Sequence, residues 1–321
     1  MKRRALLLFS EGLDSILAGK ILQEQGIEII ALRFITPFFG WQWKGKEEAF
    51  DRYVQEEFGF EKGLIVDLSA EFLKMLAQPK HGYGSGFNPC VDCKILMLKK
   101  AKELMPVLGA HFLVTGEVVG QRPMSQQRNT LRHIEKEAGV EDVLLRPLSA
   151  KKLKPSRVEE MGLVDRERLL DISGRGRKKQ LALAQALGLK KIPSPAGGCL
   201  LTDPALAPRF ERFFALKGGE VTPKEAEILT FGRHFELPGG SWLVIGRNQA
   251  ENARLQALVG DRTILKLSQI PGPTGALLIE KGEQDLQEAA SLIKRYAPKA
   301  RNLEKVAIRV IRKGKEEIIW A

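Results

Sequence analysis

The sequence predicts an α/β protein: a doubly wound parallel sheet followed by a smaller α+β domain. Residues 5–9 (ALLLF) and 27–35 (IEIIALRFI) are apolar runs typical of strands buried on both faces. A helical pattern lies between them, and the alternation of strand and helix patterns continues to about residue 187. After about residue 208 the pattern changes to short strands separated by turn signals.

The first helix is predicted over residues 13–25. Its apolar side chains fall on one face at Ile16, Leu17, Ile21 and Leu22, and Gly26 can end it. Strand, helix and strand together form a βαβ unit, which requires the two strands to be parallel.

The rest of the first domain repeats this alternation. The predicted strands are 63–68, 111–115 and 143–148, and the predicted helices are 94–108 and 178–187. Two basic, poorly periodic stretches interrupt the pattern at 150–157 and 173–179. Both lie beside the predicted ligand crevice, so we expect them to contact phosphate, with solvated loops as the alternative.

The second domain begins with short elements. Thr222, Pro223 and Glu225 have the pattern of a helix start, with an N-cap, a first-turn proline and a capping-box acid. The predicted elements that follow are strands at 241–247, 262–267 and 275–280, a helix at 283–296, and a hairpin across 312–315. We therefore predict domains at 1–205 and 206–321.

Composition narrows the class of partner. The 321 residues include 51 Lys and Arg against 39 Asp and Glu, a net charge of +12, which favours a polyanion such as nucleic acid over a merely solvated basic surface. No apolar run reaches the roughly 18 residues of a membrane helix, and residues 5–9 are too short for a signal peptide. Three cysteines argue against a disulfide framework, so we expect a cytoplasmic protein with no membrane partner.

An anion-binding loop is predicted directly after the first strand, in the sequence SEGLDS at 10–15. Backbone N–H groups at a helix start are unpaired and bind phosphate. Gly12 allows close approach of the ligand, Ser10 and Ser15 can donate hydrogen bonds, and Asp14 suits a Mg²⁺ ion that bridges it to phosphate. The spacing is neither that of a Walker loop nor that of a dinucleotide fingerprint.

The cysteines form a second candidate site. Cys90 and Cys93 are a C-x-x-C pair in NPCVDCK, and Cys199 lies among small residues in SPAGGCLLTD. Three thiolates could hold a [4Fe-4S] cluster and leave one iron open. The alternatives are a redox dithiol or persulfide chemistry at Cys199, and a zinc site that needs a fourth ligand.

The loop resembles the S-G-G-x-D-S signature of the PP-loop ATP pyrophosphatases, which have an adenine nucleotide alpha hydrolase-like fold and cleave ATP to AMP and pyrophosphate. Glu11 departs from it, standing where the family has a small residue. We expect the Glu11 side chain to point away from the ligand; the alternative is that it holds Mg²⁺ beside Asp14.

Further motifs resemble the tRNA 4-thiouridine synthetases: TGEVVGQRPMSQ at 115–126 and LRPLSA at 145–150. The resemblance implies that sulfide, free or from a sulfur-donor protein, is transferred to tRNA, with a [4Fe-4S] cluster on Cys90, Cys93 and Cys199. It implies catalytic roles for Asp14, Glu117 and Cys199. It also implies ATP and Mg²⁺ binding by Phe9, Ser10, Gly12, Leu13, Asp14, Ser15, Phe34, Gly116, Glu117 and Gln121.

The second domain resembles the NFACT RNA-binding domain through VIGRNQAENARLQAL and LKLSQIPGPTGALLI. Well-known 4-thiouridine synthetases hold tRNA with an N-terminal RNA-binding domain, and here we expect the C-terminal domain to do so. The family's aromatic and histidine residues before the proline are replaced by 267–269 (LSQ), and a packing role without RNA contact is the alternative. The expected RNA-binding residues are Arg175, Arg177, Lys178, Arg247, Asn248 and Asn252.

The expected function is therefore ATP-dependent tRNA thiolation, with adenylation of a uridine carbonyl and replacement of its oxygen by sulfur. Two alternatives remain: a PP-loop enzyme acting on a small molecule, and a non-catalytic RNA-binding protein with a degenerate loop. A homodimer remains an open oligomeric state. The four histidines, at 81, 111, 133 and 234, show no spacing that suggests a catalytic triad, so we interpret them as ordinary surface or core residues.

Overall fold

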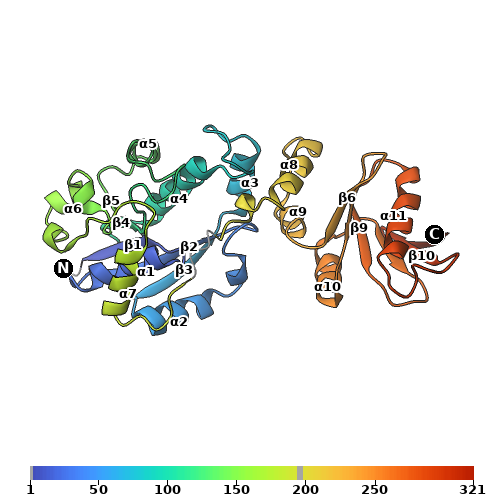
Figure 1. The fold of residues 1–321 in the computed structure, drawn as a ribbon, viewed down its shortest axis with the longest axis horizontal. Coiled ribbons are helices and arrows are strands. Elements are labelled where there is room, and N and C mark those ends of the chain that lie inside the picture. The colour runs from blue at the N-terminus through green and yellow to red at the C-terminus, as the bar shows by residue number, and fades with distance from the viewer. Residues whose placement is uncertain (1–2, 194–197) are drawn as a thin grey trace. The chain divides into compact units, whose positions relative to one another are not determined.

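The computed structural model describes residues 3–193 and 198–321, and Figure 1 shows its fold. The chain divides into two compact units, one up to Ala207 and one from Pro208 on. Residues 194–197, which precede Cys199, lie outside the described part of the chain.

The first unit is built on a five-stranded parallel sheet in the order β3-β2-β1-β4-β5. Because β2 and β4 pair with opposite edges of β1, the strand order reverses between β1 and β4. Open α/β sheets bind ligands at such a topological switch point. The strands are β1 Arg4–Leu8, β2 Glu28–Ile35, β3 Lys62–Asp67, β4 Phe112–Thr115 and β5 Leu144–Leu145.

Helices cover both faces of this sheet, with α1, α2 and α7 on one face and α3, α4 and α5 on the other (Figure 1). The predicted doubly wound architecture is therefore confirmed. The helices are α1 Leu13–Gln23, α2 Glu47–Phe58, α3 Ser69–Ala77, α4 Cys90–Leu104, α5 Arg128–Ala138, α6 Arg157–Glu160 and α7 Lys178–Ala186.

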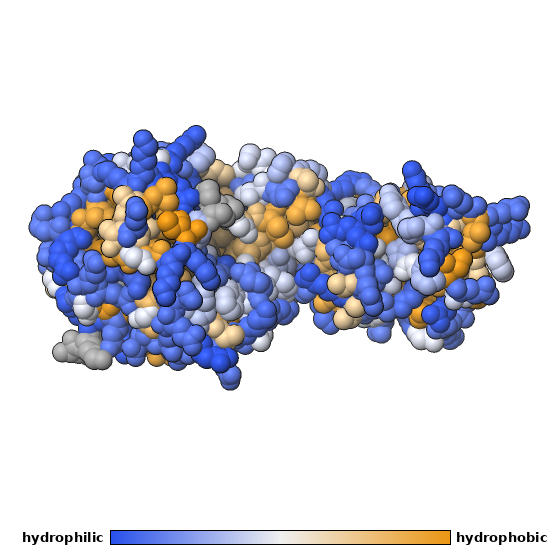
Figure 2. All heavy atoms as spheres, turned by 60° about the horizontal axis from the view of Figure 1, so that its bottom comes forward, coloured by the Kyte–Doolittle hydropathy of each residue, from blue (hydrophilic) through white to orange (hydrophobic). Residues whose placement is uncertain are grey.

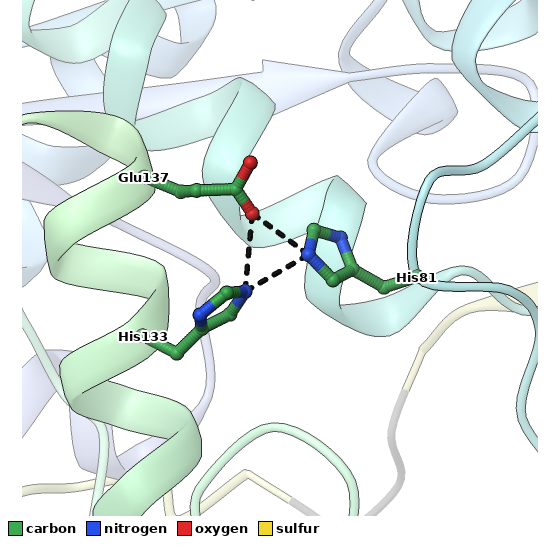
Figure 3. Close-up of side chains that lie close together, drawn as sticks. All are labelled: His81, His133 and Glu137. Carbon is green, nitrogen blue, oxygen red and sulfur yellow. Dashed lines mark hydrogen bonds and ion pairs between the residues drawn. The ribbon is translucent and has the colours of Figure 1, made fainter.

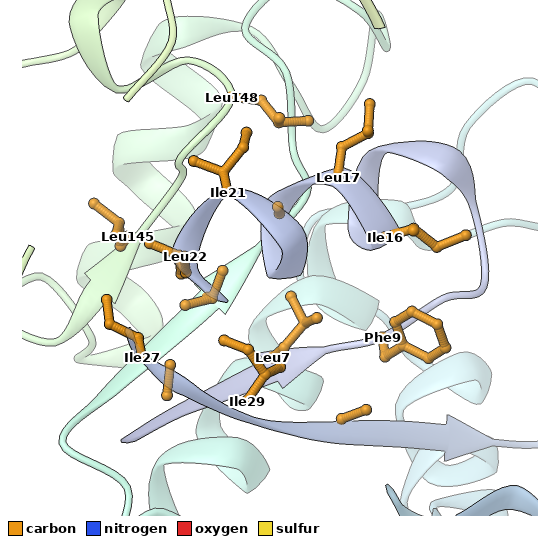
Figure 4. Packing of buried hydrophobic residues seen from close by; sticks show 14 of the residues in the cluster. Leu7, Phe9, Ile16, Leu17, Ile21, Leu22, Ile27, Ile29, Leu145 and Leu148 are labelled. Atoms are coloured by element: carbon orange, nitrogen blue, oxygen red, sulfur yellow. The ribbon is translucent and has the colours of Figure 1, made fainter. Parts of the chain in front are cut away.

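The core of this unit lies between α1 and the sheet (Figure 4). Leu17 and Leu22 of α1 are fully buried, as is Leu7 of β1. Helix and sheet approach closely at Gly19, where a Cβ atom would lie 2.6 Å from the Phe60 ring. This packing fixes the start of α1, and with it the loop that joins β1 to α1.

The second unit is an antiparallel sheet with helices, so the predicted α+β domain is also confirmed. Its six strands follow the order β11-β10-β8-β9-β7-β6. The strands are β6 Arg233–Glu236, β7 Trp242–Ile245, β8 Ile264–Leu267, β9 Thr274–Ile279, β10 Ala307–Arg312 and β11 Lys315–Trp320. The helices are α8 Ala207–Leu216, α9 Pro223–Ile228, α10 Gln249–Leu258 and α11 Glu283–Arg295.

Most predicted elements are present, and the differences have simple causes. The capping box of Thr222 and Glu225 forms as expected at the start of α9. The helix predicted at 94–108 begins earlier, at Cys90, because its first turn contains small and polar residues that hide the helical pattern. The strand predicted at 143–148 shortens to two residues, since the chain turns before Pro147.

The surface is largely hydrophilic on the face seen in Figure 2, with separate hydrophobic areas. Large apolar side chains that are exposed in the described residues include Val107 in the first unit and Trp320 in the second. None of the described helices combines the length and apolar character that a membrane crossing requires.

His234 should make the second unit sensitive to acid. Burial, followed by the charge of Arg209, lowers the pKa of His234 to about 3. Its ring donates from Nε2 to the Phe231 carbonyl (2.7 Å) and accepts at Nδ1 from Trp242 Nε1 (3.0 Å), so the folded state holds a neutral imidazole. Between its unfolded pKa of about 6.5 and the folded value, only the unfolded chain gains this proton, and stability falls as pH falls.

The measurement is amide hydrogen exchange in β6 and β7 of the full chain, compared with His234→Gln. The stability difference between the two proteins should narrow below about pH 6.5, by roughly 1 kcal/mol per pH unit at most. A difference that stays constant from neutral pH down to pH 4.5 contradicts the neutral-imidazole account.

Candidate nucleotide and thiol site

The loop between β1 and α1 is shaped by its own hydroxyl groups. Ser10 Oγ accepts from the Gly12 amide (3.3 Å), and Ser15 Oγ donates to the Gly12 carbonyl (2.8 Å). Gly12 is the N-cap of α1, and because glycine has no side chain, no side-chain hydrogen bond caps this helix. The first amides of α1 therefore remain available to an anion, as the sequence predicted.

Gly116 holds this loop against the end of β4. A Cβ atom at this position would lie 2.5 Å from the carbonyl carbon and oxygen of Asp14 and from the amide nitrogen of Ser15. From the sequence we expected Gly116 to let a nucleotide approach closely. The structure gives a second reason for glycine at this position, because the loop backbone occupies the space of a side chain. Contact between Gly116 and a nucleotide remains a prediction.

Three buried oxygen atoms beside the loop have no hydrogen-bond partner: Asp14 Oδ1, Gln121 Oε1 and Glu117 Oε1. The other Asp14 oxygen accepts from Gln121 Nε2 at 2.9 Å, so these two side chains are in direct contact. Unpaired buried acceptors are costly and indicate a missing partner. Carboxylate and amide oxygens are ligands that Mg²⁺ accepts, so the residues present fit this ion.

Glu117 is held as an ionised carboxylate. Burial raises its pKa, but the charges of Lys94 and Arg146 and hydrogen bonds from Arg146 and Thr115 outweigh burial and lower the pKa below its ordinary value. Arg146 Nε donates to Oε2 at 3.0 Å, Thr115 Oγ1 donates to the same atom at 3.1 Å, and Lys94 Nζ lies 3.6 Å from Oε1. A carboxylate held in this way is a fixed negative charge and a poor proton donor.

Glu11 is turned towards β2 and the segment after it. Its Oε2 atom accepts from Trp43 Nε1 (2.9 Å) and Gln42 Nε2 (3.2 Å), and it lies 3.1 Å from Nη2 of the buried Arg33. Asp14, in contrast, contacts Gln121. These separate sets of partners favour the expectation that Glu11 points away from the ligand over a shared Mg²⁺ site.

The three cysteines lie close enough to influence one another. Burial and then the charge of Cys199 raise the pKa of Cys93, with a further contribution from Cys90. Burial raises the pKa of Cys199 to about 11, although the Leu201 and Thr202 backbone N–H groups oppose the rise. That Cys199 joins the C-x-x-C pair in one site remains a prediction.

The thiols and the anion loop are connected through charged neighbours. Lys94, which follows Cys93, lies 3.6 Å from Glu117, and its charge lowers the pKa of Cys93. Arg122, which follows Gln121, acts in the same direction on Cys199. The two candidate sites therefore border the same region.

The donor set at the cysteines fits an iron–sulfur cluster. Asn88 Nδ2 donates to Cys90 Sγ at 3.0 Å, and backbone N–H groups face Cys199. Hydrogen bonds to cysteine sulfur stabilise thiolate ligands and tune such clusters. Cys90 is also the first residue of α4, where the helix dipole favours a thiolate.

Three residues assigned to nucleotide binding have buried side chains. Phe9, Leu13 and Phe34 are each less than 5% exposed, and the Phe9 ring packs against Phe58 and Phe60. If these residues contact a nucleotide, they do so through their backbone.

The basic segment 173–179 lies beside the loop after β4, because Ser173 bridges Val119 and the Gly174 amide donates to the Val119 carbonyl (2.8 Å). Arg175 and Lys178 in this segment are exposed. Arg177 donates to the Pro193 carbonyl at 3.3 Å. The segment therefore lies beside the ligand crevice as expected, and its contact with phosphate or RNA remains a prediction.

The predicted RNA-binding residues of the second unit have local roles. Asn248 caps α10 by accepting from the Glu251 amide (2.9 Å), and Asn252 accepts from the Thr274 amide (3.0 Å). Arg247 pairs with Glu251. These contacts explain why the three residue types are needed, and RNA binding by them remains a prediction.

Residues that our sequence reasoning missed include Arg33, Lys94 and Arg146, the cations that balance the site's acids. Two histidines that we interpreted as ordinary, His81 and His133, meet at Glu137 on α5. The sequence did contain a signal for His133 and Glu137, because residues four apart lie on the same face of a helix.

Comparison with known families agrees with both domains. Residues 1–154 match the family described as thiamine biosynthesis protein (ThiI). This range takes in most of the N-terminal domain. Residues 232–320 match the NFACT protein RNA binding domain. The resemblances to the thiouridine synthetases and to NFACT domains are confirmed, while Cys199 and segment 173–179 lie outside both matched ranges.

Individual relatives point the same way. Over 174 residues, or 52% of this chain, the sequence is 31% identical to a probable tRNA sulfurtransferase of Methanobrevibacter smithii. That alignment covers 43% of the relative, so the chain spans less than half of its length.

The chain also resembles solved structures at low sequence identity. A 4-thiouridine synthetase–RNA complex with bound ATP is 18% identical, with 70% of this chain and 53% of that chain covered and a TM-score of 0.37. A predicted tRNA methyltransferase subunit of Methanocaldococcus jannaschii is 15% identical, with 70% and 92% covered and a TM-score of 0.37.

Replacing Glu11 by glycine should destabilise the protein. The backbone φ of Glu11 is 62°, a strained value for a residue with a side chain, and glycine would relieve about 1 kcal/mol. Loss of the carboxylate would leave the buried Arg33 unpaired, at a cost of about 3 kcal/mol. We expect a net loss of about 2 kcal/mol, measured by urea unfolding of the full chain.

The matched control is the double variant Glu11→Gly with Arg33→Met, in which no charge is left unpaired. Its stability should recover most of the loss. An increase in stability for Glu11→Gly alone would show that the ion pair does not hold this loop.

Proposed function

We propose that this protein is an ATP-dependent tRNA thiolase that adenylates a uridine carbonyl and replaces its oxygen with sulfur. The observation that carries the proposal is the contact of Asp14 with Gln121 beside the free amides of α1, together with the contact of Lys94, the neighbour of Cys93, with Glu117. The ThiI-type domain and the relative named as a probable tRNA sulfurtransferase support the same activity. The NFACT-type domain supplies an RNA-binding surface.

In this mechanism the loop residues bind and orient ATP. The free amides of α1 and the hydroxyls of Ser10 and Ser15 would bind the phosphates, and Asp14 and Gln121 would hold Mg²⁺, which would offset phosphate charge. The uridine carbonyl oxygen attacks the α-phosphorus, and the bond to pyrophosphate breaks. Lys178 and Arg175 are the exposed cations that would offset charge on the leaving pyrophosphate.

The second half replaces the activated oxygen. Cys90, Cys93 and Cys199 would hold a [4Fe-4S] cluster, which would supply iron to bind the sulfide. The new carbon–sulfur bond forms as the carbon–oxygen bond breaks, and the oxygen leaves in AMP. The fixed negative charge of Glu117 keeps Arg146 and Lys94 in place, and the target base must leave its stack to reach the site.

The activity test uses the full chain with ATP, Mg²⁺, sulfide and unmodified tRNA. We expect thiouridine in the nucleoside digest and pyrophosphate release that depends on tRNA. Asp14→Asn should lower both by about 100-fold, because it removes the carboxylate charge that would hold the metal. Glu24→Gln, an exposed acid near the end of the same helix, is the matched control and should leave both unchanged.

Two outcomes would overturn the proposal. Pyrophosphate release that tRNA does not stimulate indicates a small-molecule substrate. Tight RNA binding without turnover indicates a non-catalytic RNA-binding protein.

The cluster has its own test. Protein purified without oxygen, or reconstituted with iron and sulfide, should be brown with broad visible absorbance. Serine at any one of the three cysteines should make this absorbance weak or labile, while tRNA-dependent pyrophosphate release persists in Cys199→Ser. A reconstituted native chain that stays colourless contradicts the cluster assignment and leaves persulfide chemistry as the better account.

A further inference from the structure

Three metal-binding side chains converge outside the site described above. His81 comes from the segment between α3 and α4, and His133 and Glu137 come from one face of α5; their side chains point towards one another (Figure 3). The two Nε2 atoms are 2.9 Å apart, and Glu137 Oε2 lies 2.7 Å from His81 Nε2 and 3.1 Å from His133 Nε2. Among the described residues, these three side chains form a group whose possible ligand atoms all lie within 4.8 Å of one another.

Hydrogen bonds within this cluster leave one buried oxygen atom, Glu137 Oε2, without a donor. His81 Nδ1 lies 3.0 Å from Asp92 Oδ1, and a carboxylate there holds the proton on Nδ1. In the neutral ring, Nε2 then presents a lone pair to Glu137. The two ring Nε2 atoms share a hydrogen bond, but Glu137 Oε2 is buried, accepts no hydrogen bond and lies 2.7 Å from His81 Nε2, a position that a cation would satisfy.

The surrounding charges keep the carboxylate ready to bind a cation. The ammonium group of Lys80 forms an ion pair with the Glu137 carboxylate. Lys80 contacts Oε1, which leaves Oε2 facing the two rings.

We propose that His81, His133 and Glu137 bind one divalent metal ion of the Zn²⁺ class, with Asp92 as the residue that orients His81. Two imidazoles and a carboxylate are a ligand set typical of zinc, and ligands at its usual bond lengths stand about 3.4 Å apart in a tetrahedron. The observed separations of 2.7, 2.9 and 3.1 Å are shorter than this by about 0.3 to 0.7 Å, a difference that side-chain rotation can supply. The His133 side chain is 49% exposed, so an ion can enter and water can complete the set.

The position of Asp92 gives the metal a structural role. Asp92 lies between Cys90 and Cys93 in the first turn of α4, and it also accepts from the backbone amides of Lys80 (3.2 Å) and His81 (3.0 Å). An ion on His81 would therefore join α5 to the segment and the helix turn that carry the C-x-x-C pair. Orienting carboxylates of this kind raise ligand basicity and fix the ring.

The experiment separates this site from the cysteines. The full chain with all three cysteines changed to serine is titrated with Co²⁺ and then with Zn²⁺, and bound metal is counted by mass spectrometry. We expect one ion per chain, visible cobalt bands without the intense near-ultraviolet absorption of thiolate ligands, and a higher melting temperature with Zn²⁺. Amide hydrogen exchange in residues 80–92 should slow when Zn²⁺ binds.

Variants in the same background identify the ligands. His133→Ala and Glu137→Gln should weaken metal binding by roughly 100-fold or more, and Asp92→Asn by about 10- to 100-fold. Lys136→Ala, an exposed neighbour on α5, is the matched control and should bind as the parent does. The proposal fails if the serine background binds no metal, or if His133→Ala and Glu137→Gln bind as tightly as the control.

Discussion

The parallel pairing of β1 with β4 is the constraint on which the candidate site depends. Leu8 pairs with Thr115, so the loop after β1 and the loop after β4 leave the sheet side by side. Gly116 then meets the backbone of Asp14 and Ser15, with no room for a side chain. A slip of one residue would turn the side chains of β4 to the opposite face and separate the Asp14–Gln121 pair.

Buried charge gives this edge of the sheet its rigidity. Glu117 and Glu135 are the acids, and Arg146 contacts both while Lys94 contacts Glu117. Removing Arg146 would take the hydrogen-bonded cation from the buried Glu117, which costs more than the loss of a surface ion pair. Because Lys94 follows Cys93 and Glu135 lies between His133 and Glu137, the same network fixes the helix turns that carry the thiols and the proposed metal ligands.

The sequence predicted features that depend on local interactions better than features that depend on contacts between distant residues. Most strands coincide with apolar runs along the chain, and these runs were sufficient to place them, but β6 was not predicted. Helix α5 was missed although Leu131, Ile134 and Ala138 form its buried face, because most of its residues are polar. His81 and His133 are 52 residues apart, and no local pattern indicates that tertiary packing brings their rings to 2.9 Å.

Glu11 shows why a loop that binds an anion can itself contain one. Glycine would suit the left-handed backbone better, so the glutamate must offset strain of about 1 kcal/mol. It does so through Arg33, a residue that burial would otherwise leave as an isolated charge. Since the pair is neutral as a unit, the carboxylate does not oppose the positive field at the start of α1. Anion binding, as we propose it for this loop, would therefore depend on its backbone amides, and the side chain at position 11 serves the stability of β2.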